Sequence, residues 1–237
     1  KAQWIGCVVL PEGASGNAVA PLRDGGFVVT KFMDTRRGNM RDQFLRREAT
    51  SVMYRWSPRA GFSVVPGGEV LGRNGVVVSP DERWLYATGW VGKRVLRLPL
   101  NGEGAPTVVS IDFMPDNLRP APDGSLLITG QASAIELLAV CHRSFCPADW
   151  GVARLNPETM QLSYLAWEKG TSAFAGATTA VQVGDKLFLG TFRGDRVAIA
   201  PICDRYRRSR DQRRGLEGES GAGHDCGSWK SGPISYR

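Results

Sequence analysis

Hydrophobic residues along the chain occur in short runs separated by turn residues, a pattern typical of many short β-strands rather than long helices. The clearest example is residues 73–89, RNGVVVSPDERWLYATG. An Asn-Gly pair opens an apolar strand, Ser-Pro-Asp makes a turn, and a second apolar strand ends in Thr-Gly. This pattern predicts an antiparallel hairpin. Its first polar residue, Asn74, is either a turn former or one member of a set that meets in space.

The same hairpin pattern recurs along the chain. Four segments begin with a polar residue, reach a turn Asp seven residues later and a Thr thirteen or fourteen residues after the start: 17–30, 74–88, 116–129 and 178–191. We call the first residue of each segment the head of the repeat. The four heads are Asn17, Asn74, Asp116 and Thr178. Self-similarity at fixed offsets is the signature of a repeat architecture.

Further apolar strands follow each hairpin. They are expected at 51–56 and 62–66, at 94–100 and 107–112, at 151–156 and 162–167, and at 196–201. Units of four antiparallel strands are the blades of a β-propeller, so we predict an all-β propeller fold with about four blades in this chain. Two packed sheets would hold as many strands but would not explain the equal offsets. Two interruptions, 34–48 and 131–150, are predicted to be polar or partly helical excursions.

Length and composition leave the compartment open. The 237 residues are 42% hydrophobic, enough to bury a sizeable core. No apolar run approaches the roughly 18–20 residues that span a bilayer, so no membrane span is expected. The first ten residues lack the shape of a secretory signal, and there is no initiator Met. A soluble cytoplasmic protein, or a periplasmic or secreted one without its leader, fits equally well, and the oligomeric state is not readable.

The net charge of +7 is unevenly distributed. Residues 203–237 carry eight Lys or Arg against five Asp or Glu, whereas residues 1–202 carry 22 against 18. We therefore expect a propeller domain at 1–202 and a basic tail at 203–237 that is disordered or non-native. The tail is basic but lacks any nucleic-acid-binding module, so binding to nucleic acid is not expected.

The cysteines do not define a metal site. Two of the five, Cys141 and Cys146, lie close together in CHRSFC. A zinc site built from them and His142 would lack a fourth ligand. The pair is therefore expected to be two free thiols or a local disulfide.

The heads are candidates for a shared site. Equivalent positions in propeller blades start at the same depth beside the central channel, so their side chains converge. Two carboxamides (Asn17, Asn74) and one carboxylate (Asp116) make an oxygen-rich set that suits Ca²⁺ better than zinc, although another divalent cation would also fit. Local turn chemistry explains any single head, but it does not explain the shared offsets.

Two segments also resemble a known family. NGVVVSPDERWLYAT (74–88) is similar to the Asn-Gly-hydrophobic-Ser-Pro-Asp-x-x-x-Leu-Tyr pattern of the senescence marker protein/gluconolactonase family. MPDNLRPAPDGSLLITG (114–130) resembles that family's Pro-Asp-Gly/Asn segment, which paraoxonases and strictosidine synthase-like proteins share. The resemblance covers about residues 4–202. It implies a six-bladed propeller with a channel Ca²⁺, acting as a hydrolase on lactones or related esters.

The resemblance also implies roles for single residues. Asn17, Asn74 and Asp116 match metal ligands, and Asp116 also matches the general base. Asn117 matches an Asn used by paraoxonase-like members, and with Thr178 it is expected at the substrate. The family's first-blade Glu ligand and the paraoxonase His pair have no counterparts, which suggests an N-terminally truncated member. The alternatives are a non-catalytic propeller that binds a small ligand or a protein, and strictosidine synthase-like activity, for which no Glu stands out.

Overall fold

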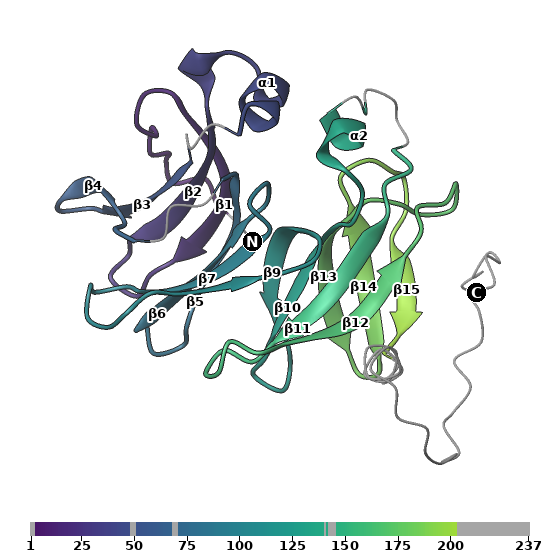
Figure 1. Ribbon diagram of the computed structural model, residues 1–237. Coiled ribbons are helices and arrows are strands. Elements are labelled where there is room, and N and C mark those ends of the chain that lie inside the picture. The colour runs from purple at the N-terminus through teal and green to yellow at the C-terminus, as the bar shows by residue number, and fades with distance from the viewer. Residues whose placement is uncertain (1–2, 48–50, 68–70, 140, 142–145, 203–237) are drawn as a thin grey trace. The chain divides into compact units, whose positions relative to one another are not determined.

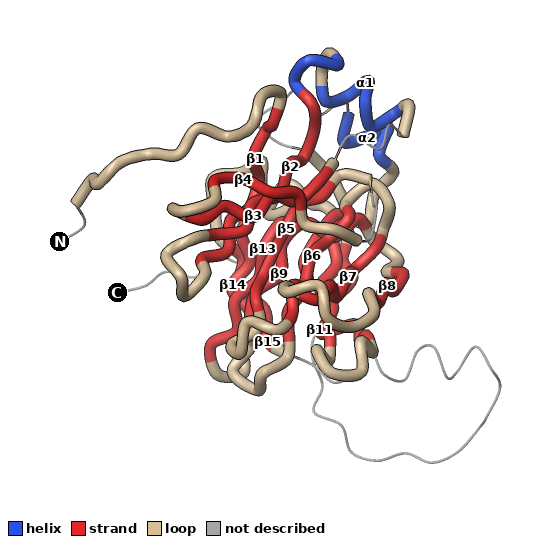
Figure 2. The backbone as a smooth tube through the Cα atoms, turned by 90° about the vertical axis from the view of Figure 1, so that its left-hand side faces the viewer, coloured by secondary structure: helices blue, strands red, loops and turns tan. Residues whose placement is uncertain are grey.

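A computed structural model describes residues 3–47, 51–67, 71–139, 141 and 146–202 (Figure 1). Most of the regular structure in these ranges is β-strand, as Figure 2 shows. By internal contacts the chain divides into two compact units, Lys1–Leu118 and Arg119–Arg237, and each unit is treated on its own below. The predicted basic tail lies outside the described residues.

The strands form four antiparallel sheets, each with its strands in chain order. Blade 1 contains β1 (Ala14–Pro21), β2 (Phe27–Asp34), β3 (Val52–Ser57) and β4 (Gly61–Val64). Blade 2 contains β5 (Arg73–Val78), β6 (Trp84–Gly89), β7 (Arg94–Pro99) and β8 (Thr107–Ser110). Blade 3 contains β9 (Met114–Pro120), β10 (Leu126–Gln131), β11 (Trp150–Leu155) and β12 (Leu162–Glu168). Blade 4 contains β13 (Ala177–Val183), β14 (Lys186–Thr191) and β15 (Ala198–Pro201). These meanders confirm the predicted all-β fold of propeller blades.

Both predicted interruptions contain short helices. The first holds η1 (Thr35–Arg37) and α1 (Met40–Leu45), and the second holds α2 (Ile135–Ala139). In the second interruption Cys141 and Cys146 form a disulfide, which decides between the two states expected from the sequence. No helix in the described ranges is long and apolar enough to cross a membrane.

Each unit has an aliphatic core between two successive blades. In the first unit, Val28 and Met53 of blade 1 pack with Leu85 and Leu96 of blade 2. The corresponding core of the second unit joins blade 3 to blade 4, with Leu127, Val152, Leu187 and Leu189 among its members. Because alternate residues of a strand point to opposite faces, each blade offers two apolar faces. We call the face toward the preceding blade the near face and the other the far face.

The strand register tests the sequence repeat. In blades 1, 2 and 4 the residue two positions after the head pairs with β2, β6 or β14: Val19 with Val29, Val76 with Ala87, and Ala180 with Leu189. The heads are therefore structurally equivalent in these blades. By the same register Gly190, not Thr191, occupies the position of Thr30 and Thr88. The predicted equivalence of Thr191 is wrong because the β13–β14 turn is one residue shorter than the turn in blade 1.

Candidate functional site at the blade heads

Two buried threonines hold the heads of the first unit. The Thr30 hydroxyl accepts a hydrogen bond from the Ala18 amide (3.0 Å) and donates to the carbonyl oxygen of Asn74 (2.6 Å). The Thr88 hydroxyl accepts from the Gly75 amide (2.7 Å) and donates to the carbonyl oxygen of Asp116 (2.6 Å). Each Thr thus fixes the head region of its own blade and the head on the first strand of the following blade. Sequence reasoning noted the offset of these threonines but missed their role.

Backbone contact brings two of the heads together. A methyl group added at Gly75 would lie 2.8 Å from the Cα of Asn117 and 2.8 Å from the carbonyl oxygen of Asp116. The β5 backbone therefore lies directly against β9 at the predicted site. Only glycine allows such a close approach. The Thr30 hydrogen bonds join the β1 segment beside Asn17 to Asn74 of β5. The Gly75 contact then joins β5 to Asp116 of β9, so the first strands of three successive blades, which carry the predicted metal ligands, are connected.

Asn17 and Asn74 lie at irregularities in the strand pairing. The register of β1 with β2 shifts between Gly16 and Val19, which spans Asn17. The register of β5 with β6 shifts between Arg73 and Val76, which spans Asn74. Such bulges leave a residue outside the regular ladder and redirect its side chain, and they are frequent beside active sites.

Asn74 presents a buried acceptor at the head of blade 2. The residue is only 3% exposed, and its carboxamide oxygen Oδ1 has no hydrogen-bond partner among the described residues. A buried acceptor without a partner costs about 1–3 kcal/mol. Buried polar groups are nearly always paired, so an orphan of this kind calls for a ligand, an ion or water.

The third head is a half-buried carboxylate with an oriented side chain. Asn117 donates from Nδ2 to Oδ1 of Asp116 at 2.9 Å. This bond fixes the rotation of the carboxylate. Asn17, by contrast, is exposed, so the predicted donors range from fully buried at Asn74 to solvent-accessible at Asn17.

The fourth head lies in the second unit. Thr178 is half-buried in β13, at a register shift, and its hydroxyl is 3.5 Å from the carbonyl oxygen of Gly190. Its role at the substrate stays a prediction. The threonine link is not repeated here, because the buried Thr129 hydroxyl has no partner among the described residues and Gln131 donates to the Ala177 carbonyl instead (2.8 Å).

The predicted metal ligands at the heads carry little negative charge. In the part of the chain that the structure describes, no group of three or more His, Cys, Asp or Glu side chains is placed to hold a metal ion. A cation at the heads would depend on carboxamide oxygens, one carboxylate and water. Such oxygen donors fit Ca²⁺, which takes about 6–8 oxygens in flexible geometry, and do not fit zinc.

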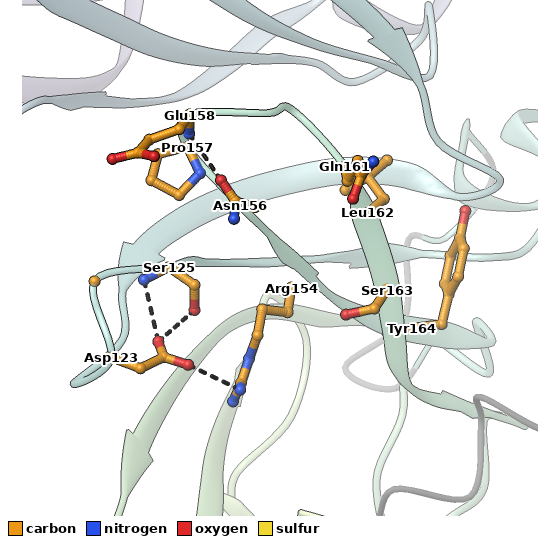
Figure 3. Close-up of a pocket in the computed structure, with 11 residues that line it drawn as sticks. Asp123, Ser125, Arg154, Asn156, Pro157, Glu158, Gln161, Leu162, Ser163 and Tyr164 are labelled. Carbon is orange, nitrogen blue, oxygen red and sulfur yellow. Dashed lines mark hydrogen bonds and ion pairs between the residues drawn. The ribbon is translucent and has the colours of Figure 1, made fainter.

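A separate pocket of about 790 Å³ lies in the second unit, between the β9–β10 and β11–β12 turns (Figure 3). Arg154 donates from Nη1 to Oδ2 of Asp123 at 2.9 Å, and the Ser125 hydroxyl also donates to Asp123. The Ser125 bonds and Arg154 lower the pKa of Asp123. Blade 1 repeats this pair as Arg55 and Asp24 (3.1 Å). The pair therefore belongs to blade architecture, and the pocket lies at the turn end of blade 3.

Comparison with known proteins supports the fold alone. No protein-family model matches the chain, and no curated protein matches it. Hydrazine synthase of Kuenenia stuttgartiensis is a similar solved structure, with a TM-score of 0.50 and 14% identity over 85% of this chain and 50% of that chain. A luciferin-regenerating enzyme also has a TM-score of 0.50, with 12% identity over 76% and 54%. A protein assigned to the gluconolactonases has a TM-score of 0.46, with 17% identity over 76% and 56%. The chain spans about half the length of these three structures.

Proposed function

We propose that the blade heads form a Ca²⁺ site of a hydrolase that opens lactones or related esters. The observation that carries this proposal is the buried carboxamide oxygen of Asn74, which has no partner in the described residues and belongs to the strand that touches the Asp116 strand. The sequence resemblance to gluconolactonases supports the same reaction class. The activity is proposed for a protein of which this chain supplies Asn17, Asn74 and Asp116.

In this proposal each residue has a distinct role. Asn74 and Asn17 provide carboxamide oxygens, and Asp116 provides the single carboxylate. A bound Ca²⁺ would supply Lewis acidity that polarises a carbonyl and stabilises negative charge on its oxygen. Asp116 accepts a proton from the attacking water, and the bond from Asn117 keeps its carboxylate in one orientation. Asn117 also contacts the substrate.

Calcium titration by calorimetry, combined with hydrolysis of a panel of lactones and aryl esters, tests the proposal. We expect the parent chain to bind Ca²⁺ and Asp116→Ala to weaken binding by roughly tenfold or more. The matched control is Asp81→Ala, because Asp81 is an exposed turn residue at the other end of β5. An Asp116→Ala protein that bound Ca²⁺ and turned over as the parent does would rule the proposal out.

A second candidate is a non-catalytic propeller that binds a small ligand through the same ion. It is favoured by the single carboxylate among Asn17, Asn74 and Asp116 and by the absence of an acidic cluster in the described ranges. Calcium binding that depends on Asp116, without turnover of any lactone or ester in the panel, would support this candidate over the hydrolase.

A further inference from the structure

The net positive charge of residues 1–202 is concentrated in one short segment. Residues 36–47, most of the first interruption, carry five Arg against one Asp, whereas the rest of residues 1–202 carries 17 basic residues against 17 acidic ones. All five arginines are exposed. The segment surrounds α1, at the end of blade 1 where β2 ends (Figure 1). We call these residues the arginine patch: Arg36, Arg37, Arg41, Arg46 and Arg47.

The patch is carried by an ordered segment. The side chain of Gln43 is fully buried, donates to the carbonyl oxygen of Asp34 (2.7 Å) and accepts from the Asp34 amide (3.1 Å). Phe44 meets Phe32 edge-on, with ring centroids 4.8 Å apart, and its centroid lies 5.5 Å from that of Trp90. These contacts hold the segment on the first unit, so its arginines are presented from a fixed base.

The stability of the segment does not explain its arginines. Arg41 lies in the first turn of α1, where a positive charge opposes the helix dipole. Arg47 has a φ of 54°, in the left-handed region that favours glycine. The side chains of Arg37, Arg41 and Arg47 form no ion pair with a described residue. Of the five, Arg46 at the C-cap complements the dipole and Arg36 pairs with Asp34.

Two exposed apolar side chains lie among the arginines. Met40 is 43% exposed and Leu45 is 38% exposed, and both belong to α1. Apolar side chains flanked by basic ones fit the boundary between lipid headgroups and acyl chains. The phosphodiester backbone of a nucleic acid would satisfy the arginines but leave Met40 and Leu45 in water. The combination therefore favours a lipid surface over a nucleic acid.

We propose that the arginine patch, together with Met40 and Leu45, binds the surface of an anionic lipid bilayer. Clusters of about 4–8 Lys or Arg on an amphipathic helix are typical of segments that bind anionic lipids. Arginine also suits phosphate groups because its planar guanidinium donates two parallel hydrogen bonds.

The patch lies at the head end of blade 1. Ala14, three residues before Asn17, pairs with Asp34, the residue at which the interruption begins. Binding through the patch therefore turns the Asn17 end of the first unit toward the lipid. The proposal does not depend on the proposed hydrolase activity.

Co-sedimentation with vesicles tests the proposal. The full chain is mixed with vesicles of phosphatidylcholine alone, or of phosphatidylcholine and phosphatidylglycerol in equal parts. We expect binding to the anionic vesicles only, weakening as the salt concentration rises. Arg41→Gln should weaken it about fivefold, the effect of one basic residue at an anionic surface. The matched control is Arg59→Gln, which removes the same charge from the exposed β3–β4 turn at the opposite end of blade 1 and should bind as the parent does.

Arg47→Gly separates lipid binding from folding. Glycine adopts a positive φ without strain, so the melting temperature of this variant should not fall below that of the parent. Its binding to the anionic vesicles should nevertheless weaken about fivefold. Residues 203–237 are the same in the parent and all variants, so their charge cannot account for a difference between them.

Several outcomes would overturn the proposal. One is a parent chain that does not bind the anionic vesicles, or binds phosphatidylcholine vesicles equally well. Another is equal vesicle binding by the parent, Arg41→Gln and Arg47→Gly. Release from the vesicles by inorganic phosphate at constant ionic strength would indicate a small phosphate site instead. Binding to a short DNA duplex without binding to the anionic vesicles would make the patch a nucleic-acid surface.

Discussion

The Thr88 hydroxyl donates to the carbonyl oxygen of Asp116 at 2.6 Å while it accepts from the Gly75 amide at 2.7 Å, so one side chain ties together the heads of two successive inner strands. Thr30 makes the same pair of bonds to Ala18 and Asn74. Threonine suits this position because its branched side chain favours a strand and its hydroxyl both donates and accepts. The alignment of the heads Asn74 and Asp116 is thus fixed from the second strands of blades 1 and 2.

Replacing Thr88 with Val should remove both bonds with little change in shape. The Gly75 amide and the Asp116 carbonyl would be left without this partner, at a cost of about 2–3 kcal/mol in the free energy of unfolding. Urea unfolding followed by tryptophan fluorescence measures the loss, and Thr88→Ser should recover much of it. The matched control is Thr129→Val, whose buried hydroxyl has no partner in the described residues. Equal losses for Thr88→Val and Thr129→Val would contradict the linking role.

Gly75→Ala should separate the two strands that carry Asn74 and Asp116. The added methyl would lie 2.8 Å from the Asn117 Cα, and backbone atoms cannot move aside as a flexible side chain can. We expect a cost of about 1–3 kcal/mol in unfolding free energy and weaker Ca²⁺ binding. At Gly92 the nearest atom would be 3.5 Å away, so Gly92→Ala should leave both quantities unchanged. Calorimetry and urea unfolding of the two variants test this contrast.

Asn74→Asp distinguishes a metal site from a structural asparagine. The substitution replaces the orphan carboxamide oxygen with a carboxylate of the same shape in a 3% exposed position. Without Ca²⁺ the buried charge should lower the melting temperature relative to the parent, because an unpaired buried carboxylate is strongly disfavoured. Excess Ca²⁺ should then raise the melting temperature of the variant more than that of the parent. A melting temperature of Asn74→Asp that does not respond to Ca²⁺ would argue against a cation at this position.

Much of the fold was predictable because turn chemistry and strand alternation are local. The fixed interval from head to turn Asp located the hairpins of blades 1, 2 and 4, and strands β3, β7 and β11 lie where the apolar runs placed them. Thr191 was wrongly matched to Thr30 and Thr88. The β13–β14 turn is one residue shorter than the turn of blade 1, which moves the β14 register by one residue, and composition does not reveal that change. The ion pairs Arg55–Asp24 and Arg154–Asp123 were not predicted. An Arg on the third strand of blades 1 and 3, opposite the turn Asp of the same blade, would have indicated them.

The site was predictable only in outline. The offsets picked out Asn17 and Asn74 as equivalent residues, yet one is exposed and the other buried. Asn74 has neighbours on both sides, because the Thr30 hydroxyl of the preceding blade bonds its carbonyl oxygen and β9 lies against Gly75 beside it. Burial by a distant strand is a tertiary effect that a residue's own neighbours in sequence do not encode.

Buried charges at the end of β2 give a pH-dependent prediction. Lys31 Nζ lies 2.9 Å from Oδ2 of Asp34, with both side chains less than 10% exposed, and Arg36 Nη2 is also 2.9 Å from that oxygen. Hydrogen bonds from Arg36 and Lys31 hold the pKa of Asp34 well below its usual value of 3.8. Asp34→Asn would leave Lys31 buried without its counter-charge, and we expect a loss of about 3 kcal/mol at neutral pH.

The sign of the pH dependence follows from the lowered pKa of Asp34. Its ionised form stabilises the folded chain above pH 3.8, and this contribution is lost as the pH falls through the lower pKa of the folded state. The difference in unfolding free energy between the parent and Asp34→Asn should therefore be largest near neutrality and shrink under strongly acidic conditions. Asp195→Asn is the control, because Asp195 pairs with Arg196 in the open and such pairs contribute little. Urea unfolding across the acidic range measures the difference, and a gap that stays constant with pH would show that the Asp34 charge is not what stabilises this end of the blade.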